Sequence, residues 1–256
     1  MKQFAANKAQ RLNVESIKFN KWLIGLVDGV GFFEITKELK IFKIIMNKKN
    51  IKLMYKIKKH LKVGKICINK SKCIYSIKNI KNIKENIIPL FDKYILQTDK
   101  FFDFINFKKA IYSNDSYYQS LNIKHKPLPC LNKWWLIGYI EAVGKLDIIK
   151  TTTKEGHLYK INIKITAKES ILLKNILKYL NIYHGITIQN NNNKSSMEYW
   201  IKIWNTPTAL NIFKIIRMLN GNIKGYMSIE FKLWFRMLKI FDTTKLVHLF
   251  QKFKSL

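Results

Sequence analysis

Long uncharged apolar runs are absent from this chain of 256 residues. A membrane-spanning helix needs roughly 18 such residues in a row, so the sequence predicts no transmembrane segment. Residues 1–19 lack the apolar core and the small-residue cleavage site of a secretory signal, so none is expected there. Hydrophobic residues still make up 48% of the chain, which is enough to build a sizeable folded core.

Cysteine is also scarce, since the chain has only Cys67, Cys73 and Cys130. Cys67 and Cys73 are close enough in sequence to face each other across a hairpin. No second cysteine or histidine pair follows at zinc-finger spacing, and the histidines form no HxxxH-type pair. We therefore expect reduced cysteines, no structural metal site and no cofactor.

Acidic residues are few, with 16 Asp and Glu against 47 Lys and Arg and a net charge of +31. A compact body with this charge repels itself, which predicts a polyanionic partner. The basic residues are spread along the chain instead of being gathered on one amphipathic helix. Nucleic acid is therefore a better fit than a membrane surface.

Arginine is the scarcest of the basic residues and occurs only as Arg11, Arg217 and Arg236. Arginine reads guanine through two parallel hydrogen bonds, so its scarcity favours recognition of backbone and shape over base edges. That mode is typical of structured RNA, whose major groove is too deep and narrow for side chains. RNA is therefore the expected partner.

The residues that are abundant, namely Lys, Ile, Asn, Phe and Tyr, can all be encoded by codons made only of A and T. This composition indicates an AT-rich, organellar genome and predicts a mitochondrial location. Part of the lysine excess then reflects mutational bias instead of selection for binding.

One segment occurs twice, as WLIGLVDGVGFFEI from Trp22 and as WLIGYIEAVGKLDI from Trp135. A repeat of this kind indicates two copies of one structural unit. Each copy reads as an apolar helix that ends in glycine and is followed at once by a strand.

Small residues are spaced four apart in both copies, as Gly25 with Gly29 and as Gly138 with Ala142. This spacing places them on one face of a helix and lets two helix backbones approach closely. We expect the two motif helices to pack on each other. Two ordinary buried helices that pack elsewhere are the alternative.

The segments after each motif follow the same order. Alternating apolar residues predict strands at 41–46 and 158–165, and apolar residues three and four apart predict helices at 51–62 and 171–181. Two short strands and further helical segments complete each copy. The predicted fold is α+β, with two pseudo-symmetric halves ordered helix, two strands, helix, two strands, helices, and with antiparallel sheets.

The expected domain boundaries follow from the repeat and from a polar, proline-bearing stretch between the copies. They are a basic N-terminal extension at 1–16, a first half at 17–119, a linker at 120–132, and a second half with a basic tail at 133–256.

The segments LIGLVDGVG (23–31) and LIGYIEAVG (136–144) resemble the two motifs of single-chain LAGLIDADG homing endonucleases and maturases. The resemblance covers about residues 17–245. It implies motif helices at a central pseudo-two-fold axis and saddle-shaped sheets that straddle a nucleic-acid duplex. It also implies, for the endonucleases, Mg²⁺ held by one acidic residue at the end of each motif helix.

The position that the resemblance assigns to the metal-binding acid is occupied by Val30 and Val143. Magnesium requires oxygen ligands, and a valine side chain has none. Asp28 and Glu141 match the family's other acidic position, for which we expect a helix-end or interface role. The resemblance therefore implies that both catalytic acids are lost, and we expect a pseudoenzyme, not an active nuclease.

Glu34 and Asp147 form another matched acidic pair, at the start of the strand after each motif. If Phe33 and Ile35 face the core, alternation directs Glu34 to the groove. The alternative to loss of catalysis is a metal site formed by Glu34 and Asp147 in place of the two valine positions.

Lysines on and beside the predicted strands are the candidate nucleic-acid contacts. For any one of these lysines, a solvated surface position is an equally good interpretation. They are Lys37, Lys43, Lys65, Lys70 and Lys72 in the first half, and Lys150, Lys160, Lys164, Lys194 and Lys202 in the second.

The leading hypothesis from sequence is an RNA-binding structural component of a mitochondrial ribonucleoprotein, above all the mitochondrial ribosome, where it would contact rRNA. It would be a monomer with an internal pseudo-two-fold. The alternatives are a group I intron maturase, a DNA homing endonuclease or nickase with an atypical site, and a DNA-binding repressor.

Overall fold

A computed structural model describes residues 2–121, 123, 125–127, 130–153, 156–182, 187–189, 198–204, 210–237, 239 and 243–256. By their contacts the residues group into two units, Met1–Ala142 and Val143–Leu256. The second motif helix falls in the first unit because it packs on the first motif helix. The described helices include none that is long and apolar enough to cross a membrane.

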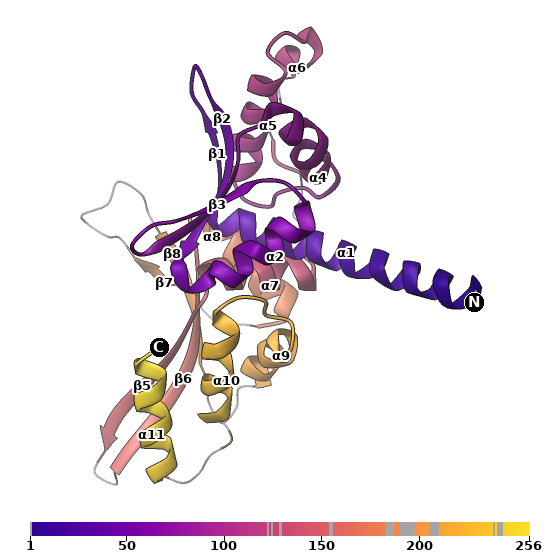
Figure 1. Ribbon diagram of the computed structural model, residues 1–256. Coiled ribbons are helices and arrows are strands. Elements are labelled where there is room, and N and C mark those ends of the chain that lie inside the picture. The colour runs from indigo at the N-terminus through magenta and orange to yellow at the C-terminus, as the bar shows by residue number, and fades with distance from the viewer. Residues whose placement is uncertain are drawn as a thin grey trace. The chain divides into compact units, whose positions relative to one another are not determined.

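The first unit begins with one continuous helix, α1 (Lys2–Val30), which ends in the first motif. The segment expected as a basic extension at 1–16 therefore belongs to this helix, and its N-terminal end extends away from the rest of its unit (Figure 1). The C-terminal part of α1 is apolar and buried, from Trp22 to Val27.

The first sheet follows α1 directly. Its strands are β1 (Gly31–Ile35), β2 (Lys40–Asn47), β3 (Lys65–Ile68) and β4 (Lys72–Ile77). They pair antiparallel in the order β1-β2-β4-β3, so the last hairpin adds to the sheet through β4. A 3₁₀ turn, η1 (Lys48–Asn50), and helix α2 (Ile51–Leu61) connect β2 to β3.

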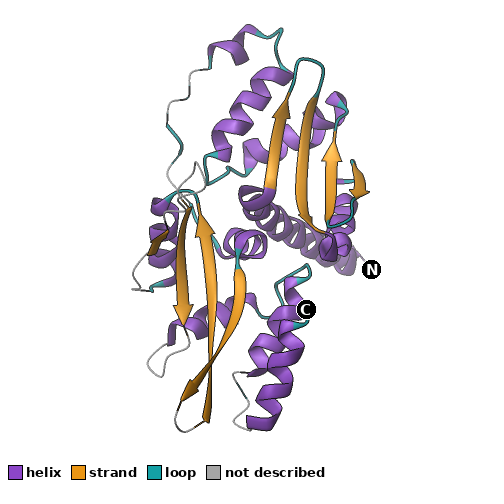
Figure 2. Cartoon of the chain, turned by 90° about the vertical axis from the view of Figure 1, so that its left-hand side faces the viewer, coloured by secondary structure: helices purple, strands orange, loops and turns teal. Residues whose placement is uncertain are grey.

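Helices cover one face of this sheet and leave the other open. They are α2, the run α3 (Ile80–Asn82), η2 (Ile83–Ile87) and α4 (Ile88–Lys93), α5 (Lys100–Ile111) and the short α6 (Ser116–Ser120). Phe33 packs against the rings of Phe91, Phe104 and Phe107 at 5.3–5.6 Å between ring centroids. These rings join α4 and α5 to β1, and Figure 2 looks onto the open face of the sheet.

Helix α7 (Lys133–Val143) contains the second motif and leads into the second sheet. Its strands are β5 (Lys145–Thr153), β6 (Gly156–Ala167), β7 (Thr187–Gln189) and β8 (Glu198–Trp204), and helix α8 (Ser170–Leu180) lies between β6 and β7 in sequence. Helices α9 (Leu210–Leu219), α10 (Met227–Met237) and α11 (Thr243–Lys254) follow.

The second sheet repeats the topology of the first, with antiparallel order β5-β6-β8-β7. Ile148, Ile161 and Ile163 are buried on its helix-facing side, where α10 packs on β5. The predicted α+β fold, with the same element order in two halves and antiparallel sheets, is thereby confirmed.

Candidate nucleic-acid interface

The two motif helices touch through their backbones. A Cβ atom added at Gly25 would lie 1.9 Å from the carbonyl oxygen of Trp135, and one added at Gly138 would lie 1.9 Å from that of Trp22. Only glycine allows this approach, because any side chain would overlap backbone atoms that cannot rotate away. Gly29 and Ala142 lie one turn further along their helices and are half-buried.

A reciprocal pair of hydrogen bonds joins the same two helices. The indole Nε1 of Trp22 donates to Glu141 Oε2 at 3.0 Å, and that of Trp135 donates to Asp28 Oδ2 at 2.7 Å. Both carboxylates are buried. The interface role expected for Asp28 and Glu141 is therefore confirmed, although the tryptophans that serve as their partners were not predicted.

Asp28 also holds the turn that precedes α5. Its carboxylate accepts hydrogen bonds from the backbone N–H groups of Gln97 (2.9 Å) and Thr98 (3.0 Å) and from the Thr98 hydroxyl (2.7 Å). Burial raises the pKa of Asp28, while these donors and Trp135 act in the opposite direction. With its oxygens engaged in this way, Asp28 ties α1 to α5.

Each motif helix ends in a valine, whose side chain has no oxygen atom. Val30 and Val143 are half-buried and offer only backbone carbonyls. The next carbonyl after Val30, that of Gly31, accepts a hydrogen bond from Lys100 Nζ at 2.5 Å. The end of the first motif helix therefore lies beside a cationic side chain.

Glu34 and Asp147, the alternative acidic pair, each have a lysine partner. Glu34 is ion-paired with Lys43 within the first sheet, and Asp147 Oδ1 lies 3.1 Å from Lys254 Nζ of α11 in the second unit. In the described part of the chain, no three His, Cys, Asp or Glu side chains come together as a metal-binding group. The expected direction of Glu34, toward the open face, is confirmed, since Phe33 packs on the helix side.

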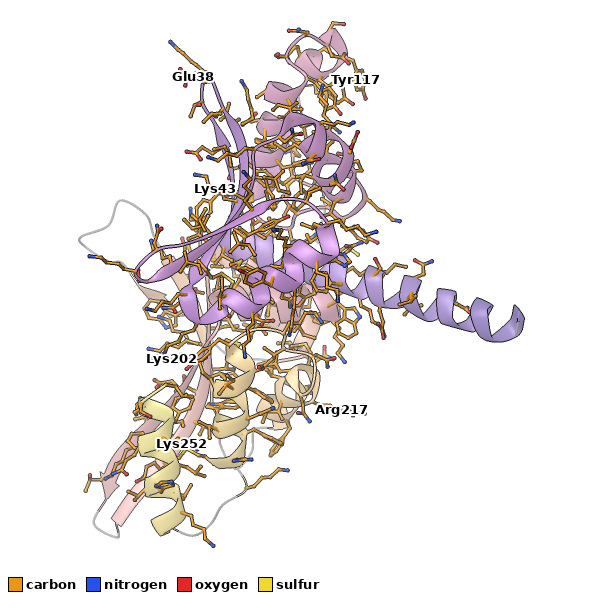
Figure 3. All side chains as sticks on the ribbon, viewed as in Figure 1. Glu38, Lys43, Tyr117, Lys202, Arg217 and Lys252 are labelled. Carbon is orange, nitrogen blue, oxygen red and sulfur yellow. The ribbon has the colours of Figure 1, made fainter. Side chains whose placement is uncertain are left out.

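The open face of the first sheet carries lysines among apolar side chains. Strand register places Lys43 opposite Phe32, Lys65 opposite Ser76 and Cys67 opposite Ile74. A concavity of about 720 Å³ lies on this face and is lined in part by Lys43, Lys65, Cys67, Ile74, Ser76 and Lys78. In Figure 3 Lys43 projects from β2 on the side away from α5.

The other first-half candidates lie at the edges of this face. Lys72 is exposed on β4 and shares the open face with Ile74 and Ser76 by alternation. Lys37 and Lys70 are exposed in the turns that follow β1 and β3. Lys78, just after β4, was not among the predicted contacts, because no strand pattern extends to it.

The second sheet brings three of the predicted lysines to its open face. Lys164 pairs with Lys202 across β6 and β8, and Lys160 lies four residues earlier on β6, opposite Ile149. The Lys164 ammonium lies 4.2 Å from the centroid of the Trp200 ring. Lys202 is exposed and is labelled in Figure 3.

Lys150 is placed differently from the prediction. It alternates with Leu146 and Ile148, both buried, and therefore shares their helix-facing side of β5 instead of the open face. The prediction for Lys150 is wrong because Lys150 lies an even number of residues after the buried Leu146 and Ile148, and alternate residues of a strand share one face. Lys194 lies outside the described residues.

The strand register shows which lysines correspond in the two halves. Lys43 pairs with the residue after Gly31, whereas the residue after Gly144 pairs with Lys164. Lys164 is therefore the structural counterpart of Lys43.

Residues 23–111 match the family model described as LAGLIDADG endonuclease. The duplicated motif helices cross through their glycines, and each is followed by a sheet of the same topology. This part of the chain is similar to the LAGLIDADG endonuclease family. The matched residues cover the first motif, the first sheet and the helices up to α5.

Two curated fungal proteins are similar to this chain. The probable intron-encoded endonuclease Cox1-I1b of Schizosaccharomyces pombe is 29% identical over 163 residues, which cover 52% of this chain and 42% of the relative. The uncharacterized mitochondrial protein RF1 of Saccharomyces cerevisiae is 27% identical over 191 residues, covering 66% and 40%. The chain thus spans about two fifths of each relative's own length.

Solved structures share the fold over nearly the whole chain. The I-LtrWI LAGLIDADG homing endonuclease bound to target DNA has a TM-score of 0.74 and 24% identity, covering 93% of this chain and 98% of its own. The LAGLIDADG meganuclease I-CpaMI bound to uncleaved DNA has a TM-score of 0.76 and 18% identity, with 92% and 98% covered. These similarities establish the fold.

The expectation that the chain is not an enzyme is contradicted by these comparisons. The matched family model is that of an endonuclease, a curated relative is named as a probable endonuclease, and the structural neighbours are homing endonucleases. Val30 and Val143 were too narrow a basis for that expectation. Their correspondence to the metal-binding acids stays a prediction.

Proposed function

We propose that this chain is a mitochondrial, intron-associated protein of the homing-endonuclease type that binds a DNA duplex on the open faces of its sheets. The observation that supports this best is the placement of lysines on those faces, with Lys43, Lys65 and Lys72 in the first sheet and Lys160, Lys164 and Lys202 in the second. Solved relatives with the same fold are bound to DNA. The curated relatives are intron-encoded or mitochondrial.

Phosphate contacts dominate such an interface. Each lysine that neutralises a phosphate releases counterions, so affinity for DNA falls steeply as salt rises. The apolar and small side chains between the lysines, such as Ile74 and Ser76, leave room for base edges to approach the strands.

Removing three open-face lysines tests the interface. In the variant Lys65→Ala, Lys72→Ala, Lys78→Ala, the slope of log K against log salt is expected to shrink by about 0.9 for each contact, nearly three in total. Fluorescence anisotropy of a labelled duplex at several salt concentrations measures the slope. The matched control removes Lys52, Lys58 and Lys59, which are exposed on α2 at the helix-covered side. Equal losses in the two variants would show that only net charge matters.

RNA is the second candidate ligand, and the scarcity of arginine favours it. In that case the chain would bind rRNA in the mitochondrial ribosome or an intron RNA as a group I maturase. Competition between a DNA duplex and a folded RNA for the same labelled site separates the two candidates. Displacement of DNA by a lower concentration of RNA would favour the ribonucleoprotein role.

A further inference from the structure

Helix α2 and the η1 turn before it carry a dense set of lysines on the helix-covered side of the first sheet. The stretch 48–62 contains seven lysines and no acidic residue, and all seven lysines are exposed. They are Lys48, Lys49, Lys52, Lys56, Lys58, Lys59 and Lys62. The opposite side of α2 is apolar and packs toward β3 and β4, through the buried residues Leu53, Met54, Ile57 and Leu61. The lysines therefore lie away from the open face.

The second half of the chain provides an internal reference for this charge. Its counterpart stretch, 167–181, has the same length and contains helix α8, but it has three lysines and one acid, Glu169. A bias toward A and T in the codons would enrich lysine in both copies alike. Codon composition therefore does not explain the excess on α2.

Some of these lysines lie where they destabilise α2 itself. Lys48, Lys49 and Lys52 lie before and in the first turn of the helix, where the partial positive charge of its N-terminus disfavours a cation. Lys52 and Lys56 form a like-charge pair four residues apart, which adds repulsion along the helix. A bound polyanion would offset both costs.

One aromatic side chain stands among these lysines. Tyr55 is 56% exposed, and Lys52, Lys58 and Lys59 lie three or four residues from it, so they flank it on one side of the helix. An exposed aromatic ring offers a stacking surface for an unpaired base, and ammonium groups on both sides of the ring suit the phosphates that precede and follow that base.

Other anionic partners fit this surface less well. A helix that binds a membrane inserts its apolar side into lipid, but the apolar side of α2 is buried within the first unit. Interfaces between proteins are depleted in lysine. A DNA duplex keeps its bases paired, whereas the loops of a folded RNA present unpaired bases that stack on aromatic side chains.

We propose that the exposed face of residues 48–62 binds an unpaired loop of a folded RNA, with Tyr55 stacked on one base and the lysines in contact with the backbone phosphates. This RNA surface is separate from the open face of the first sheet, so the chain holds an RNA and a DNA duplex at the same time. The inference goes beyond the proposed binding of a duplex and does not depend on it.

The first test measures binding of a fluorescent RNA hairpin with an unpaired loop. The variant Lys52→Ala, Lys58→Ala, Lys59→Ala is expected to bind the hairpin about tenfold or more weakly, with a salt slope lower by roughly 0.7–0.9 for each lost phosphate contact. The matched control is Lys168→Ala, Lys174→Ala, Lys178→Ala, which removes the same charge from exposed positions of the counterpart stretch. It is expected to bind within about twofold of the parent. Equal losses in the two variants would overturn the proposal.

The second test concerns the aromatic ring. Tyr55→Leu keeps an apolar side chain without the ring and is expected to weaken binding of the hairpin about tenfold, whereas Tyr55→Phe is expected to bind like the parent. Binding of a fully paired RNA is expected to be the same in Tyr55→Leu and in the parent. Thermal unfolding shows that each variant is folded. Folded Tyr55→Leu that binds the hairpin as tightly as the parent would contradict the stacking of a base on Tyr55.

The third test adds a saturating, unlabelled DNA duplex to the complex of the parent protein with the labelled hairpin. The hairpin is expected to stay bound, and its displacement would show that the two nucleic acids share one surface, which overturns the proposal. If the parent binds the duplex but not the hairpin, this inference fails and the proposed function stands. If the parent binds the hairpin through α2 but no duplex, the proposed function fails and this inference stands.

Discussion

Gly25→Ala is expected to destabilise the first unit by about 3 kcal/mol or more, which is large against a typical total stability of about 5–15 kcal/mol. The added methyl would lie 1.9 Å from the carbonyl oxygen of Trp135, well inside contact distance. Because the obstructing atom is backbone, relief requires the two motif helices to separate. Separation would also weaken the bond between Trp135 and Asp28. Urea unfolding followed by tryptophan fluorescence measures the loss.

Gly138→Ala is expected to have a comparable effect, since its Cβ would meet the Trp22 carbonyl at the same distance. The control is Asn106→Ala, which changes an exposed position of α5 to alanine and is expected to alter stability by less than about 0.5 kcal/mol. If Gly25→Ala proves as stable as Asn106→Ala, the close crossing of the helices is wrong.

Val30→Asp combined with Val143→Asp is expected to raise Mg²⁺-dependent DNA cleavage by about 100-fold or more over the parent. A carboxylate at each position would supply the oxygen ligand that valine lacks, and a bound metal contributes several kcal/mol to stabilising charge in the transition state. The new charges at helix C-termini are expected to cost only about 0.3–1 kcal/mol each. Incubation of a long DNA substrate with each protein, followed by gel analysis over time, gives the two rates.

Asn106→Asp with Gln251→Glu is the matched control, because it adds the same two negative charges at exposed helical positions, one in each unit. It is expected to cleave at the parental rate. An unchanged rate in the Val30 and Val143 variant would refute the correspondence of these valines with the metal-binding acids.

The order of elements was predictable because its causes are local. Periods of two and of three to four residues distinguish strands from amphipathic helices, and the repeated motif indicates that one topology occurs twice. The close helix crossing was predictable for the same reason. Small residues four apart in each motif, Gly25 with Gly29 and Gly138 with Ala142, are what allow two helix backbones to approach closely. The N-terminal extent of α1 was not, because residues 1–16 carry no clear apolar face.

Contacts between residues far apart in sequence were not predictable. Lys100 reaches Gly31 only because Asp28 holds the turn at Thr98, and nothing in the local pattern at Lys100 indicates this. The error at Lys150 has a similar origin, since one residue of register decides which face of a strand a side chain takes. The predicted loss of enzymatic activity was inferred from two side chains alone, whereas one curated relative is named as a probable endonuclease and the structural neighbours are homing endonucleases.

The most direct test of duplex binding by the open face uses the cysteines of the unmodified protein. Cys67 is exposed and lines the concavity on that face, whereas Cys130 is exposed outside the sheet, where its backbone N–H donates to Gln97. Alkylation of each cysteine is followed by mass spectrometry, with and without a saturating DNA duplex. Bound DNA is expected to protect Cys67 and to leave Cys130 as reactive as before. Unchanged reactivity of Cys67 in a fully formed complex would contradict the account.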